Sequence, residues 1–125
     1  MVDVICDTSF LIHLATKRIK NIDTLITEIG QIQFVVPVVC WNELVQISIN
    51  RNHSVKYQDA LKTLNFARSL KKIPTSGTYA DAVIVEYVKA YGGIIGTMDK
   101  GLKSKVKSAG GSIMSFSNNK IVLES

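Results

Sequence analysis

Two aspartates of this sequence each follow directly on a short apolar run. Asp7 comes after residues 2–6, and Asp99 comes after residues 94–98. Such runs predict buried strands, and each is followed here by a helical pattern. In an open α/β sheet, ligands bind at the carboxyl ends of the strands. If the two strands are neighbours, both carboxylates face a common cleft.

Two further acids lie near the beginnings of predicted helices. Glu43 falls in the first turns of a helix expected over residues 39–50, and Asp81 falls in the first turn of a helix over residues 78–91. Both helix starts can point at the same edge of the sheet. The sequence therefore allows four carboxylates from four separate segments to meet.

Each of these acids also has a purely structural explanation. Asp7 and Asp99 suit the N-cap positions of the helices that follow them, and Thr78 with Asp81 fits a capping box. Glu43 could be a solvated carboxylate favoured by a helix N-terminus. Taken singly, each acid is adequately explained in this way.

Taken together, the four acids favour a metal site. Carboxylates packed at one edge repel and raise one another's pKa unless a cation neutralises them. Mg²⁺ or Mn²⁺ is the ordinary cation for an all-oxygen site, and one or two ions are expected. Ser9 and Thr97 flank two of the acids and could orient a carboxylate or a metal-bound water. The candidate metal ligands and catalytic residues are Asp7, Glu43, Asp81 and Asp99.

The chain is basic. Its 15 Lys and Arg residues exceed its 10 Asp and Glu residues, which gives a net charge of +5. A basic surface favours a polyanionic partner such as RNA, although it also keeps many domains soluble. Lys100, Lys103 and Lys107 share one face of a predicted helix beside Asp99, where they could contact an RNA backbone or form a solvated face.

Strands and helices alternate along the sequence. Strands are expected at residues 2–6, 34–36, 94–98, 113–116 and 121–123. Helices are expected at residues 9–15, 22–29, 39–50, 54–70, 78–91 and 100–109, with Asn21 and Ser54 as two of the N-caps. Residues 73–77 are expected to be a connector. The alternation predicts an α/β sandwich in which helices cover both faces of a parallel sheet.

The size and composition limit the remaining possibilities. A chain of 125 residues is expected to form one domain. Cys6 and Cys40 lie in apolar runs, which indicates buried free thiols in a reducing compartment. Neither a signal peptide nor a membrane-spanning run is visible, so a cytoplasmic protein is expected.

Four segments in order resemble the motifs of PIN-domain nucleases. They are residues 6–12, residues 36–39 followed by Glu43 and Leu44, residues 79–84, and residues 96–103. The resemblance implies a three-layer α/β/α sandwich with a mostly parallel sheet, formed by residues 1–125 as a single nuclease domain. It also implies a Mg²⁺- or Mn²⁺-dependent endoribonuclease that hydrolyses RNA phosphodiester bonds. The acidic residues of the family match the same four carboxylates, and its polar helpers match Ser9 and Thr97.

The tail of the sequence refines the resemblance. Residues 110–123 are similar to archaeal PIN proteins related to small-subunit rRNA-processing nucleases. This implies an rRNA precursor as substrate and a ribosome-assembly partner. One alternative is a VapC-type toxin ribonuclease masked by an antitoxin. Another is a catalytically degenerate RNA-binding scaffold, because Ala82 stands where many relatives carry a second acid. The amphipathic segments 39–50 and 57–70 could pair in a homodimer, although a monomeric core explains the same pattern.

Overall fold

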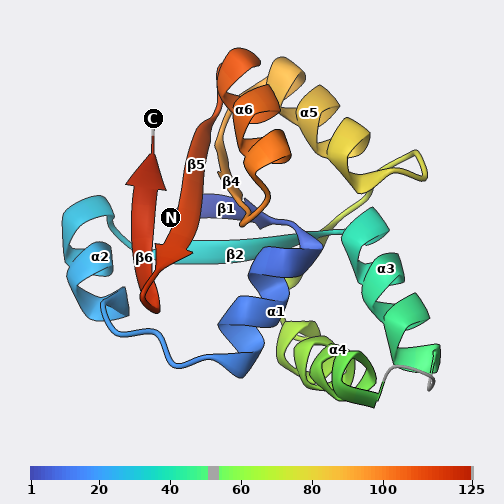
Figure 1. The fold of residues 1–125 in the computed structure, drawn as a ribbon. Coiled ribbons are helices and arrows are strands. Elements are labelled where there is room, and N and C mark those ends of the chain that lie inside the picture. The colour runs from blue at the N-terminus through green and yellow to red at the C-terminus, as the bar shows by residue number, and fades with distance from the viewer. Residues whose placement is uncertain (51–53, 125) are drawn as a thin grey trace.

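A twisted sheet forms the centre of the protein. The computed structural model describes residues 1–50 and 54–124, and among these residues the sheet has six strands in the order β3-β2-β1-β4-β5-β6 (Figure 1). The strands are β1 (Val2–Cys6), β2 (Ile32–Pro37), β3 (Lys71–Ile73), β4 (Ile94–Gly96), β5 (Ser112–Ser117) and β6 (Lys120–Glu124). All neighbouring strands are parallel except β5 and β6, which are antiparallel. The mostly parallel sheet expected from the sequence is confirmed.

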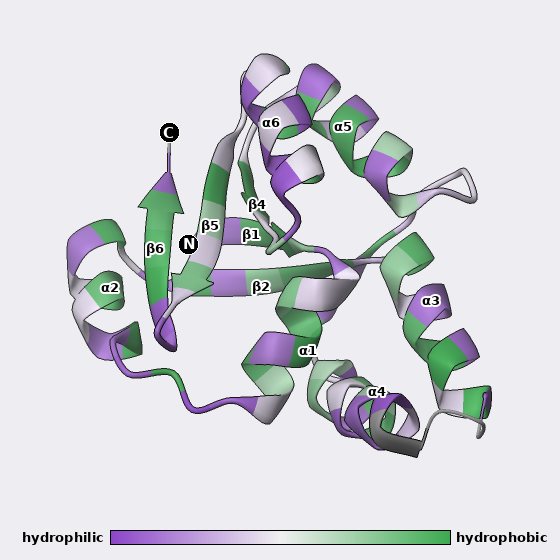
Figure 2. Ribbon diagram, in the orientation of Figure 1, coloured by the Kyte–Doolittle hydropathy of each residue, from purple (hydrophilic) through white to green (hydrophobic). Residues whose placement is uncertain are grey.

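Helices cover both faces of this sheet. They are α1 (Thr8–Thr16), α2 (Ile22–Ile29), α3 (Val38–Ile49), α4 (Ser54–Ala67), α5 (Ala80–Tyr91) and α6 (Lys100–Ser108). One apolar core lies between the sheet and α1, α2 and α4, and the other lies between the sheet and α5 and α6, with the start of α3. Purple and green bands alternate along α5 and α6 in Figure 2, as expected for helices with one apolar side. The three-layer sandwich is therefore confirmed.

Strand β1 shows why the inner strands are apolar on both faces. Val4 packs into the core beneath α1, whereas Ile5, the next residue, packs into the core beneath α5 and α6. Successive side chains of a strand point to opposite faces, so a strand covered on both sides needs a continuous apolar run. Cys6, at the end of this run, is a buried free thiol, and so is Cys40. The expectation of free, buried cysteines is confirmed.

A close approach between α1 and β4 depends on a glycine. A Cβ atom added to Gly96 would lie 2.7 Å from Cδ1 of Phe10. The Phe10 ring also stacks on Phe116 with ring centroids 4.7 Å apart. Gly96 therefore lets a large aromatic side chain hold α1 against the sheet. This packing brings the end of β4 next to the end of β1, where Gly96 pairs with Cys6.

Three local features differ from the sequence-based expectations. The helix expected to reach residue 70 ends at Ala67, and β3 occupies part of the expected connector as an edge strand beside β2. Helix α5 begins at Ala80 after Tyr79, so the capping box of Thr78 and Asp81 does not form. The short strand escapes prediction because its two lysines give no alternating pattern. The expected cap at Ser54 concerns a side chain that lies outside the described residues.

The side chain of Asn21 holds β6 instead of capping α2. Its Nδ2 donates to the carbonyl of Ile121, and its Oδ1 accepts from the amide of the same residue. Asn21 does occupy the N-cap position, but its side chain makes no cap hydrogen bond. The tight turn before β6 contains Asn118 and Asn119, both with positive φ, as two-residue hairpin turns require. Strand β6 is the fifth strand expected from the sequence.

Within the described part of the chain, no helix combines the length and apolar character that crossing a bilayer demands.

Candidate active site

Asp7 stands at the junction of β1 and α1, and most of the hydrogen-bond acceptor sites of its carboxylate are occupied. Oδ1 accepts hydrogen bonds from the amide of Phe10 and the hydroxyl of Ser9, both at 2.9 Å, and Oδ2 accepts one from the hydroxyl of Thr97. The residue is only 7% exposed. Burial raises the pKa of Asp7, the three donors lower it in part, and the negative charge of Asp81 raises it further. Because a carboxylate has about four acceptor sites, one site on Oδ2 remains.

Asp99 stands at the equivalent junction of β4 and α6. Its Oδ1 accepts from the amide of Leu102 at 2.9 Å, which caps the helix. Its own amide donates to the hydroxyl of Thr97 at 3.0 Å. The hydroxyl of Ser9 accepts, at 3.4 Å, from the amide of Met98. Two hydroxyl groups therefore connect the segment after β1 to the segment after β4.

Both aspartates thus have the capping role and a position at the proposed site. The strands that precede them are direct neighbours, and the strand order reverses between these two strands. The chain proceeds from β1 through β2 to β3 on one side and from β4 to β6 on the other. This crossover point is where open α/β sheets bind their ligands. The capping explanation and the site explanation are therefore compatible.

Glu43 and Asp81 reach the same region from α3 and α5. Glu43 is half-buried, and desolvation raises its pKa, as do the charges of Asp7 and Asp81. The nearby Thr8 hydroxyl lowers that pKa in part. Asp81 is exposed in the first turn of α5. Neither acid caps a helix, so both side chains are available to a ligand.

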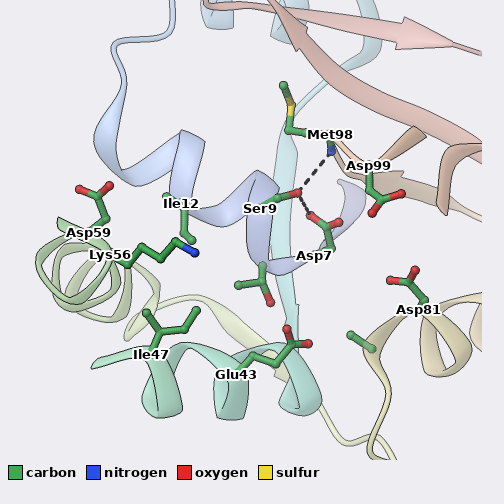
Figure 3. Close-up of a pocket in the computed structure, with 12 residues that line it drawn as sticks. Asp7, Ser9, Ile12, Glu43, Ile47, Lys56, Asp59, Asp81, Met98 and Asp99 are labelled. Carbon is green, nitrogen blue, oxygen red and sulfur yellow. Dashed lines mark hydrogen bonds between the residues drawn. The ribbon is translucent and has the colours of Figure 1, made fainter. Parts of the chain in front are cut away.

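All four carboxylates line one cavity of about 590 Å³ (Figure 3). The lining consists of Asp7, Thr8, Ser9, Ile12, Glu43, Ile47, Lys56, Asp59, Ala80, Asp81, Met98 and Asp99. The sequence-predicted acids and Ser9 therefore come together, and the buried Thr97 lies behind them in contact with Asp7. Five carboxylates and a single lysine make this part of the described surface strongly acidic, although the whole chain is basic.

The predicted RNA-binding lysines lie elsewhere. Lys100, Lys103 and Lys107 are absent from the lining of the cavity. Lys103 Nζ lies 3.2 Å from Oε2 of Glu124, and Lys107 Nζ lies 3.3 Å from Oε1 of the same side chain. Two of the three lysines are therefore paired within the protein.

Sequence reasoning missed Lys56 and Asp59. Both belong to α4 and line the cavity at the end away from Asp81. Their spacing of three residues, which puts them on one helix face, was the available signal. Because α4 is far in the sequence from every motif, their place in the cavity was not predicted.

The side chains of the cavity fit a hard divalent cation by their chemistry. The donors are carboxylate and hydroxyl oxygens, which suit Mg²⁺ and Mn²⁺. Burial and the neighbouring negative charges raise the pKa values of Asp7 and Glu43, and a bound cation would offset both effects. The Thr8 hydroxyl offers one more oxygen in the lining. Within residues 1–50 and 54–124, however, no three Asp, Glu, His or Cys side chains already form a coordinating group. The residues therefore surround a space for a cation without forming a closed cage.

The missing second acid at position 82 has a structural interpretation. Ala82 lines two neighbouring hollows together with Tyr79 and Glu86, and not the cavity that contains the carboxylates. Asp81 lines one of these two hollows as well as the cavity, whereas Ala82 does not reach the cavity.

A mostly parallel sheet between two helical layers, with acids at the crossover point, is the arrangement expected of a PIN domain. The chain belongs to this family, because a family model described as "PIN like domain" matches residues 4–118. Among solved structures, the PIN domain endonuclease Utp24 is similar, with 29% sequence identity and a TM-score of 0.75. That match covers 98% of this chain and 90% of the other.

A second solved structure supports the fold alone. It is a domain of a functionally unknown protein from Methanocaldococcus jannaschii DSM 2661, with 18% identity and a TM-score of 0.58. The match covers 94% of this chain and 92% of that one. The search of curated proteins found no match.

Proposed function

We propose that this PIN domain is a divalent-metal-dependent endoribonuclease that hydrolyses RNA phosphodiester bonds. The observation that carries the proposal is the cavity at the crossover point of the sheet, which Asp7, Glu43, Asp81 and Asp99 line together. The similarity to an endonuclease of the same family supports this assignment. The resemblance of residues 110–123 to rRNA-processing relatives favours an rRNA precursor among the RNA substrates.

The four acids would hold Mg²⁺ or Mn²⁺. Asp7 contributes its remaining Oδ2 acceptor site, Asp99 contributes the oxygen that does not cap α6, and Asp81 and Glu43 face them from the other helices. A divalent cation in such a site lowers the pKa of a water and offsets charge on the scissile phosphate. We propose one firmly held ion, with a second recruited when substrate phosphate adds its oxygens.

The protein's own groups fix the geometry of the reaction. Ser9 and Thr97 keep the Asp7 carboxylate oriented by donating to its two oxygens. Thr97 also holds the Asp99 backbone. Water attacks in line with the leaving 3′ oxygen, so the products carry 5′-phosphate and 3′-hydroxyl ends. The surrounding carboxylates act as ligands, and no side chain forms a covalent intermediate.

A second candidate function is a metal-free RNA-binding scaffold. The observation in its favour is that Ala82 stands where many relatives carry a second acid. Calorimetric titration with Mn²⁺ separates the two candidates. Binding that disappears in Asp7→Asn supports the nuclease, whereas the absence of binding by the wild-type protein supports the scaffold.

RNA cleavage with added Mn²⁺ tests the nuclease directly. We expect Asp7→Asn and Asp99→Asn to abolish cleavage while circular dichroism shows an intact fold. Asp23→Asn is a matched control, because Asp23 is an exposed aspartate of α2 outside the cavity. Equal cleavage by the wild type, Asp7→Asn and Asp99→Asn would refute the proposed function.

A further inference from the structure

The cavity extends beyond the carboxylates to a second end formed by α4. Lys56 and Asp59 of α4 line this end, and Ile12 of α1 and Ile47 of α3 lie between it and the carboxylates (Figure 3). In this view the Lys56 ammonium group is directed toward Ile12 and away from its own helix. The cavity therefore combines an acidic end, an apolar middle and an α4 end where the positive charge of Lys56 stands beside the negative charge of Asp59.

The charge of Lys56 is unusual in this setting. It is the only cation that the described residues contribute to a cavity with five carboxylates. The ion pairs found in residues 1–50 and 54–124 involve Lys89, Lys103 and Lys107, and Lys56 is in none of them. An exposed ammonium group that points into an acidic cavity without a carboxylate partner can accept an external anion.

A polyanion entering this cavity needs positive charge at more than one point. Each RNA phosphate carries a negative charge, and the carboxylates would repel it at short range. A divalent ion would offset the charge only near the four carboxylates. Lys56 supplies a fixed positive charge at the other end, where the phosphate of an adjoining nucleotide would lie.

The volume and the apolar middle suit a nucleotide. The cavity of about 590 Å³ falls within the range of about 300–1,000 Å³ that is typical of small-molecule pockets. Both faces of a nucleobase are apolar, and Ile12 and Ile47 offer apolar side chains on α1 and α3. A lysine binds phosphate as a point charge and does not select a base.

We propose that Ile12, Ile47 and Lys56 form a nucleotide subsite beside the scissile position, in which Lys56 binds the phosphate of the neighbouring nucleotide. This inference rests on the proposed function, because it assigns part of the same cavity to RNA. The subsite accepts single-stranded RNA without base preference. Lys56 is a binding residue here, and the carboxylates remain responsible for the chemistry.

RNA affinity, measured without turnover, tests the subsite. The probe is a short fluorescein-labelled single-stranded RNA, and anisotropy is recorded in Ca²⁺ to suppress cleavage. We expect Lys56→Ala to weaken binding about fivefold and to lower the slope of log affinity against log salt by about 0.7. Lys62→Ala is the matched control, since it removes an exposed lysine of α4 that lies outside the cavity. We expect it to change affinity by less than about twofold, and Lys56→Arg to retain most of the affinity.

Neutral methylphosphonate groups, placed singly at each internal phosphate of the RNA, locate the contact. One substitution should weaken binding of the wild type and have no further effect on Lys56→Ala. Equal affinities of Lys56→Ala and Lys62→Ala, with the same methylphosphonate profile in both, would overturn the subsite. If the two variants behave equally but the wild type cleaves RNA, the proposed nuclease activity is retained and only the subsite is rejected. If the wild type binds RNA through Lys56 but never cleaves it with Mn²⁺, the nuclease fails and the binding site stands. A wild type that binds no RNA would overturn both.

Discussion

Two carboxylates of this protein, Asp7 and Glu124, occupy opposite electrostatic environments. Asp7 is buried at the end of β1, where desolvation raises its pKa and three neutral donors only partly compensate. Glu124 is at the end of β6, where hydrogen bonds from Lys103, Ser115 and Lys107 lower its pKa. The protein supplies its own cations to one carboxylate and none to the other.

This contrast separates an acid that is paired within the protein from one that we propose as a metal ligand. Lys103 and Lys107 form ion pairs with Glu124 and connect β6 to α6. Both oxygens of the Glu124 carboxylate are therefore already paired within the protein. The cavity keeps several carboxylates together, and burial, with the charges of neighbouring acids, raises the pKa values of Asp7 and Glu43. Groups with shifted pKa values inside a cavity are typical of functional sites. The comparison leads to five predictions.

Substitution of a carboxylate at each location should affect cleavage very differently. Asp99→Asn removes a proposed ligand and should reduce cleavage by more than about 100-fold, above the 10- to 100-fold typical of groups behind the ligands. Glu124→Gln should leave cleavage unchanged. Initial rates on a single-stranded RNA with Mn²⁺ measure both. Similar losses in the two variants would mean that the acidic cavity has no special role.

Added Mn²⁺ should stabilise the wild type through the cavity. At a concentration about 100-fold above the dissociation constant, a ligand specific for the folded state adds about 2.7 kcal/mol to the free energy of unfolding. Asp7→Asn should lose most of this gain, and Glu124→Gln should keep it. Urea denaturation with and without Mn²⁺ is the measurement. An equal gain in both variants would place the ion elsewhere.

Removing the hydroxyl group that donates to Asp7 should reduce cleavage, whereas removing the one that donates to Glu124 should not. Thr97 donates to Asp7, and Ser115 donates to Glu124 at 3.1 Å. Thr97→Val keeps the shape of the side chain but removes this donor, so cleavage should fall about 10- to 100-fold. Ser115→Ala should cleave like the wild type. Steady-state rates with a thermal melt of each variant separate lost orientation from lost folding.

The two carboxylates should give opposite slopes of stability against pH. The folded-state pKa of Asp7 is raised, so its contribution is fully present below its ordinary value of 3.8 and is lost as the pH rises through the raised value. The pKa of Glu124 is lowered, so its contribution is present above 4.5 and is lost as the pH falls through the folded value. Urea denaturation across the carboxylate range should show the first effect vanish in Asp7→Asn and the second in Glu124→Gln. A wild-type curve unaffected by either substitution would contradict these assignments.

Removing the charge of Glu124 should have a minor effect on stability. Its partners Lys103 and Lys107 are partly exposed, so solvent and salt screen the pairs. Glu124→Gln should lower the free energy of unfolding at neutral pH by less than about 1 kcal/mol, and high salt should remove the difference. Denaturation at low and high salt checks this. A large, salt-independent loss would show that hydrogen bonding to Ser115 dominates.

Much of the candidate site could be predicted because the signal is local. An apolar run that ends in aspartate identifies a strand and its carboxyl end, and this pattern placed Asp7 and Asp99 correctly at neighbouring strands. The motif spacing supplied Asp81 and Glu43, which line the same cavity. Their catalytic and metal-binding roles remain predictions.

The features missed depend on contacts between distant segments. Lys56 reaches the cavity because α4 packs against α1 and α3, and the spacing of Lys56 and Asp59 on one helix face does not say what that face contacts. Asn21 has the sequence signature of a helix cap, but its side chain forms hydrogen bonds with the backbone of Ile121, which is 100 residues away in the sequence. Tertiary hydrogen bonds compete with local ones, and single-sequence reasoning sees only the local ones.

The hydroxyls of Ser9 and Thr97 have a consequence for binding entropy. Each bridges the segments after β1 and β4, because Ser9 contacts Asp7 and Met98 while Thr97 contacts Asp7 and Asp99. The two segments are thus immobilised relative to each other during folding, before any ligand arrives. The divalent ion that we propose would meet preorganised aspartates and would lose little affinity to ordering them.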